Sequence, residues 1–116
     1  MKQAAVTTTP PLTLEPAHAE ALAALLKALA NPLRLRIVEV LCGGATHVTR
    51  LAEVLEVGQA VVSQQLRILR MCGLVKATRT NGFAVYRIAG PFLPELLACV
   101  RQCGAGADGV GDGSGR

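Results

Sequence analysis

From about residue 16 to residue 71, apolar residues recur every three or four positions, the spacing expected of helices that bury one face. Asn31 followed by Pro32 marks a helix start, because an asparagine side chain caps a helix end and proline suits the first turn. Glycines mark where helices are expected to end. The pattern predicts four helices, at about residues 16–30, 32–42, 47–55 and 59–71.

The pattern changes after Gly73. Residues 74–89 alternate apolar and polar positions around Asn81-Gly82, a dipeptide that suits a two-residue hairpin turn because both of its positions need positive φ. We therefore expect a β-hairpin, followed by a last helix from about Pro91 to Cys103.

This order of elements predicts a mainly α-helical fold with a small β-hairpin, the winged helix-turn-helix, in which helix 59–71 enters the major groove of DNA. The residues of that helix expected to face the core are Val62, Leu66 and Leu69. Those expected to face the groove are Gln59, Ala60, Ser63, Gln64 and Arg67. At the tip of the hairpin, or wing, the residues expected to reach an adjacent phosphate backbone or minor groove are Arg79, Thr80 and Asn81.

The distribution of charge supports this prediction. The net charge is +4, and residues 57–90 contain five basic residues but no Asp or Glu. In a DNA groove, carboxylates would be repelled by phosphate, whereas amides, hydroxyls and guanidinium groups can bond to base edges. A segment with one sign of charge suits a polyanion, so we expect double-stranded DNA as the partner.

The chain of 116 residues suits a single small domain, with 3% aromatic residues and therefore a core of aliphatic side chains. Residues 1–15 are expected to form a flexible arm and residues 104–116 a disordered Gly-rich tail, so residues 16–103 would form the domain. A small leucine-rich domain often completes its core by dimerising.

Other classes of protein find little support. The sequence shows no secretory signal and no stretch as long as a membrane span, so we expect a cytoplasmic protein with reduced cysteines. We expect no enzyme: there is no Cys-x-x-Cys and no phosphate-binding loop, and no His or acid is spaced to activate Ser63. His18 and His47 are expected to have surface or capping roles.

Three segments together resemble the ArsR/SmtB family of bacterial transcriptional repressors, over roughly residues 18–103. They are "LKALANPLRLRIVEVL", "VGQAVVSQQLRILRMCGLV" and "TNGFAVYRI". The resemblance implies a homodimer whose first and last helices form the interface. It also implies a repressor that binds operator DNA and releases it when an effector binds.

The effector sites of the best-known branches are missing. The branch that senses arsenic and cadmium carries Cys-x-Cys in the third helix, where this chain has His47 and Thr49. The branch that senses zinc and nickel carries Asp-x-His and further His residues in the last helix, where this chain has Gly90 and Phe92 and no histidine.

Cys99 and Cys103 lie four residues apart, which places both sulfur atoms on one face of the last helix. They could bind As(III) or another thiophilic metal ion, with Cys42 or a second chain supplying a third ligand, or they could be joined by oxidation. We expect no other cofactor. Either event would perturb the helix expected to hold the dimer together.

Two alternatives remain open. The cysteines could be structural, in a winged-helix repressor with no metal or redox effector; Cys42 and Cys72, each directly before a glycine, are expected to fill the last turn of a helix in the core. The other alternative is a thiol enzyme or metal carrier on a helical scaffold, which only a failure to bind any DNA would favour.

Overall fold

The computed structural model describes residues 14–102. The helices are α2 (Pro16–Leu29), α3 (Pro32–Cys42), α4 (Val48–Leu55) and α5 (Gln59–Met71). The strands are β1 (Val75–Thr80) and β2 (Phe83–Ile88), and residues 92–102, called the last helix below, are also helical. The predicted tail lies outside the described residues, as does the predicted arm except for residues 14 and 15.

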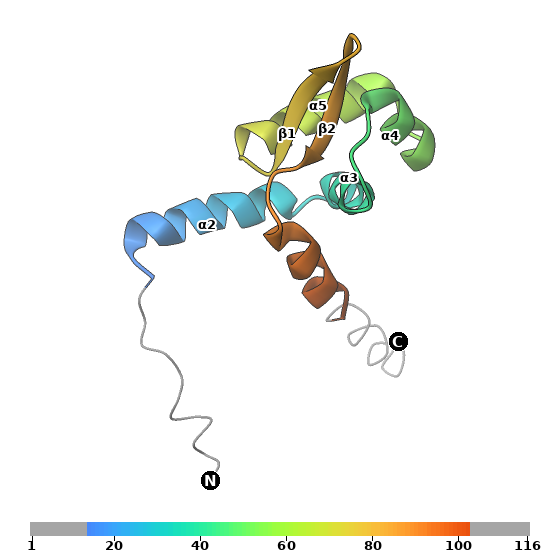
Figure 1. Ribbon diagram of the computed structural model, residues 1–116. Helices are drawn as coiled ribbons and strands as arrows, with labels where there is room; N and C mark the ends of the chain where they lie inside the picture. Colours follow the sequence, from blue (N-terminus) through green and yellow to red (C-terminus); the bar gives the residue numbers. More distant parts are fainter. Residues whose placement is uncertain (1–13, 103–116) are drawn as a thin grey trace, which may run out of the picture.

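Figure 1 shows α4, α5 and the hairpin on one side of the molecule, with α2 and the last helix extending from the other side. The hairpin contacts α3, α4 and α5, so it is packed onto the helical core. This arrangement is a winged helix-turn-helix, which confirms the predicted fold class.

The core lies where α3, α4, α5, the start of β1 and the last helix meet. Its fully buried large side chains are Ile37, Val38, Leu51, Val62, Leu66, Leu69, Leu74 and Leu93. The three residues of α5 predicted to face the core are among them, and this prediction is confirmed. In contrast, α2 contributes only Ala28 and Leu29 to the buried set, so most of its surface stays exposed among residues 14–102.

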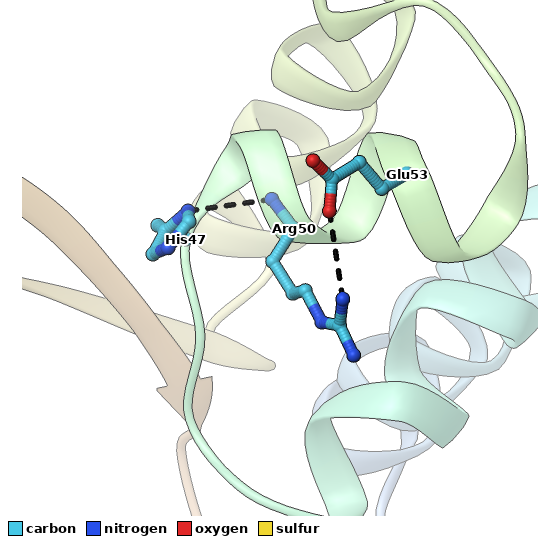
Figure 2. A network of polar contacts seen from close by, with 3 residues as sticks. All are labelled: His47, Arg50 and Glu53. Atoms are coloured by element: carbon cyan, nitrogen blue, oxygen red, sulfur yellow. Dashed lines mark hydrogen bonds and ion pairs between the residues drawn. The ribbon is translucent and has the colours of Figure 1, made fainter.

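Local polar contacts define where the helices begin. The Asn31 side chain accepts a hydrogen bond from the Arg34 N–H at 3.0 Å, which confirms the predicted cap of α3. His47 caps α4 through Nδ1, which accepts from the Arg50 N–H at 3.3 Å (Figure 2). The Arg50–Glu53 ion pair beside it spans 3.5 Å between two exposed side chains and therefore adds little stability.

Replacing Asn31 by alanine is expected to lower the free energy of unfolding by about 1 kcal/mol, because the first turn of α3 would lose its side-chain acceptor. Urea unfolding followed by circular dichroism measures the change. Asn31→Ser restores an acceptor and should recover most of the loss. A variant Asn31→Ala as stable as the wild type would contradict the assigned cap.

The wing is a two-stranded antiparallel sheet in which Val75 pairs with Ile88 and Thr80 with Phe83. Both turn residues have positive φ, 53° at Asn81 and 84° at Gly82, so the predicted hairpin turn is confirmed. Thr46 and Tyr86 exchange two backbone hydrogen bonds, of 3.0 and 2.7 Å, which tie the loop before α4 to β2. The wing is thereby fixed relative to α4 and α5.

Candidate nucleic-acid interface

One face of α5 is open to solvent and free of acidic side chains. This recognition face consists of the residues predicted to meet the groove, all of which are exposed: Gln59, Ala60, Ser63, Gln64 and Arg67. Since Val62, Leu66 and Leu69 are fully buried on the opposite side, the helix cannot rotate without exposing its core face. The recognition face therefore presents amide, hydroxyl and guanidinium groups on a rigidly packed helix.

The wing tip carries the second predicted set. Arg79, Thr80 and Asn81 are all exposed. Arg79 Nη1 donates a 2.8 Å hydrogen bond to the Gly82 carbonyl, which orients the guanidinium across the turn. Its other N–H groups are the ones available to a phosphate. The DNA contacts of the recognition face and the wing tip stay predictions.

Sequence reasoning left one basic surface unassigned. An open groove of about 420 Å³ lies between the end of α5 and the base of the wing, where Arg70, Lys76 and Arg87 meet. Lys76 and Arg87 are directly paired across the two strands, and Arg87 Nη1 donates to Thr78 Oγ1 at 3.3 Å. The absence of acidic residues from 57–90 already indicated a basic surface in this segment. Only the strand register brings these three cations together.

Known proteins resemble this chain in both sequence and fold. The family model described as "Bacterial regulatory protein, arsR family" matches residues 31–77. The HTH-type transcriptional regulator NmtR of Mycobacterium tuberculosis is 40% identical over 88 residues, which cover 76% of this chain and 73% of NmtR. This chain belongs to the ArsR/SmtB family.

Solved structures agree with the family. The homodimeric winged helix-turn-helix DNA-binding domain Mb0332 from Mycobacterium bovis superposes with a TM-score of 0.73 at 28% identity, covering 90% of this chain and 95% of that one. The transcriptional repressor BigR from Xylella fastidiosa gives a TM-score of 0.69 at 32% identity, covering 75% and 89%. The ArsR/SmtB chain described here is thus a DNA-binding transcriptional repressor, not an enzyme, as its sequence predicts.

The cysteines of this ArsR/SmtB member lie in different surroundings. Cys99 is exposed and lines an open, mainly apolar groove of about 440 Å³ between α2 and the last helix. The other residues of this apolar groove are Leu22, Leu25, Leu26, Phe92, Glu95 and Leu96. Cys103 lies outside the described residues. Cys72 is exposed, so the expectation that it packs in the core is wrong: it is the C-cap residue that follows the last helical residue of α5, Met71, and it does not lie on the buried face of the helix.

Cys42 is half-buried at the end of α3, against the core cluster. Burial raises the pKa of the Cys42 thiol above its ordinary value; the nearby Arg101 guanidinium lowers it and the Glu39 carboxylate raises it. Arg101 and Glu39 form an ion pair that joins the last helix to α3. Cys42 thus lies near Arg101 of the last helix, whereas Cys99 lines the groove between that helix and α2.

We expect Cys42 to react with iodoacetamide more slowly than Cys72 at pH 8. A raised pKa leaves a smaller fraction of reactive thiolate at a given pH, and burial adds steric protection. The rate at Cys42 should rise as the pH rises toward its pKa. Mass spectrometry of peptides from timed reactions gives the two rates, and unfolding in guanidinium should make them similar. Labelling of Cys42 in the folded protein as fast as that of Cys72 would contradict this assignment.

Within residues 14–102, no group of three His, Cys, Asp or Glu side chains could hold a metal ion. The predicted effector set of Cys99, Cys103 and Cys42 includes a residue beyond that range and stays a prediction. None of the helices between residues 14 and 102 is both long and apolar enough to cross a membrane.

Proposed function

We propose that this repressor acts as a homodimer that a thiol-reactive signal at the cysteines of the last helix releases from its operator. The observation that carries the proposal is the position of Cys99 in the apolar groove between α2 and the last helix. A ligand or a bond formed at this sulfur atom would change the packing of the two helices that we assign to the dimer interface.

The DNA-binding half of the proposal rests on the recognition face and the wing tip. Ser63, Gln64 and Arg67 would bond to base edges in the major groove, and Arg79 would contact the phosphate backbone. The three cations in the groove at the base of the wing, Arg70, Lys76 and Arg87, would add attraction to phosphate that does not depend on base sequence. Operator affinity should therefore fall with increasing salt.

The homodimer in this proposal rests on apolar surface that is exposed in the described part of the chain. Leu26 is 54% exposed and Phe92 41% exposed, although both belong to amphipathic helices of a small domain. A second copy of the chain would cover these side chains, and the relative Mb0332 is homodimeric. We place the dimer in the bacterial cytoplasm, where its cysteines stay reduced until the signal arrives.

Arsenite-like As(III) is one signal class that fits thiols at Cys99 and Cys103, with Cys42 or a second chain as a third ligand. Each As–S bond forms as a thiol proton leaves with one hydroxyl of arsenous acid as water. Oxidation is the other class: peroxide would take two electrons and two protons from a thiol pair, giving a disulfide and two waters. Both reactions alter the end of the last helix.

A repressor without a metal or redox effector is the second candidate. It is favoured by the surroundings of Cys42, where burial raises the thiol pKa and holds the side chain against the core, as in a structural cysteine. In that case the repressor would be regulated by its own abundance.

The deciding experiment titrates the reduced protein onto DNA from the region upstream of its own gene, followed by fluorescence anisotropy, with and without arsenite, cadmium or peroxide. Under the main proposal, one thiophilic agent releases the DNA, and Cys99→Ser abolishes this release. Cys72→Ser is the matched control, because Cys72 is also exposed in a single chain but lies at the end of α5. Binding that none of these agents weakens would favour the second candidate.

A further inference from the structure

Arg34 makes three hydrogen bonds at the junction of three helices. Its backbone N–H donates to the Asn31 side chain at 3.0 Å, as part of the cap of α3. Its side-chain Nε donates to the Ala28 carbonyl at 2.5 Å, and its Nη1 donates to Gln65 Oε1 at 2.8 Å. The guanidinium group therefore bonds to the end of α2 and to the middle of α5 at the same time.

Each contact has a local physical reason. Ala28 lies in the last turn of α2, where carbonyl groups lack helical partners and a positive charge is favoured by the helix dipole. Gln65 is half-buried on α5 and is not part of the recognition face. All three bonds are partly buried, so solvent competes for them less than for a surface contact.

The positions of these partners have a consequence for DNA binding. Under the proposed function, α2 belongs to the dimer interface and α5 reads the operator. A symmetric dimer must place its two recognition helices about 34 Å apart to match successive major grooves. The angle between α2 and α5 within one chain decides that distance, and a small change of angle is amplified over the length of the dimer.

We propose that Arg34 is a positioning residue that sets the recognition helix relative to the dimer helix and thereby determines which half-site spacing the dimer accepts. It acts through Ala28 and Gln65 and does not itself contact DNA. The planar guanidinium directs two donors at fixed angles to one another, whereas a lysine has a single ammonium group on a flexible stem. A lysine at this position would keep the charge but could not hydrogen-bond to Ala28 and Gln65 in the same way.

The test measures affinity for a series of duplexes. The inverted repeat protected by the wild-type protein in its own upstream DNA is synthesised with the natural centre and with one base pair inserted or removed. The variants are Arg34→Lys, Gln65→Leu and the double variant. Arg36→Lys is the matched control, because Arg36 is exposed on the same helix. Sedimentation confirms that each variant is dimeric, and thermal unfolding confirms that it is folded.

We expect the wild type and Arg36→Lys to prefer the natural spacing strongly. Arg34→Lys should reduce this preference about tenfold, the equilibrium equivalent of one charge-assisted hydrogen bond. Gln65→Leu should act similarly, and the double variant should add little, because both changes break the same link.

Two results would overturn the inference. If Arg34→Lys and Gln65→Leu lower affinity equally at every spacing, Arg34 only stabilises the fold. If the wild-type protein binds none of the duplexes, the proposed DNA function fails, and the inference that rests on it fails with it. The two failures are distinguishable, because the first leaves wild-type operator binding intact.

Discussion

Replacing Gln64 by glutamate is expected to weaken operator binding by about a hundredfold. The side chain belongs to the exposed recognition face, within a segment that contains no Asp or Glu. A good amide contact to a base contributes about 1–3 kcal/mol of discrimination, and a dimer loses it twice. The new carboxylate also faces phosphates, which repel it. Fluorescence anisotropy with the protein's own upstream DNA measures the change.

The matched control is Gln102→Glu, the same chemical change on the last helix, which Figure 1 shows on the other side of the molecule from α5 and the wing. It alters the net charge equally, so it separates a local effect from a general loss of attraction. Operator affinity of Gln64→Glu within about threefold of this control would show that the exposed face of α5 does not enter the groove.

Replacing Leu26 by glutamate is expected to dissociate the dimer and, with it, to abolish tight operator binding. Leu26 lines the apolar groove and is 54% exposed in a single chain. In a dimer it would be covered, and burying an unpaired carboxylate at each of the two equivalent positions is strongly unfavourable. Glutamate is a good helix former, so α2 itself should persist. Sedimentation equilibrium at micromolar concentration gives the association state.

Ala24→Glu is the control for this variant, because Ala24 is exposed on α2 and is not part of the apolar groove. It should remain dimeric and bind DNA with at most a small loss. Both variants should keep the helical circular dichroism signal, since neither residue belongs to the buried core. A Leu26→Glu protein as dimeric as Ala24→Glu would place the interface elsewhere on the chain.

Much of the fold could be predicted because its signals are local. A capping side chain and a proline act within one helical turn, which is why Asn31-Pro32 located the start of α3. The Asn81-Gly82 turn depends only on two backbone conformations. The buried residues of α5 follow from helical spacing, and so does its exposed face. The ArsR/SmtB resemblance rested on these same segments.

The parts that could not be predicted depend on contacts between distant segments. The chain reads Ser63-Gln64-Gln65, yet Gln64 is exposed while Gln65 accepts a hydrogen bond from Arg34, 31 residues away. Spacing placed Gln64 on the exposed face but does not reveal the partner of Gln65, because that contact arises from the packing of α3 against α5.

The sequence by itself thus determined the elements, their order and the acid-free face of α5, because helix periods, caps and turns are short-range. Only the tertiary structure decided which surfaces the remaining residues occupy. It separated Cys42, beside the Arg101–Glu39 ion pair, from Cys99 in the apolar groove, and it left Cys72 exposed. The physical reason is that burial and side-chain partners depend on how the helices pack, and packing joins residues that the sequence keeps far apart.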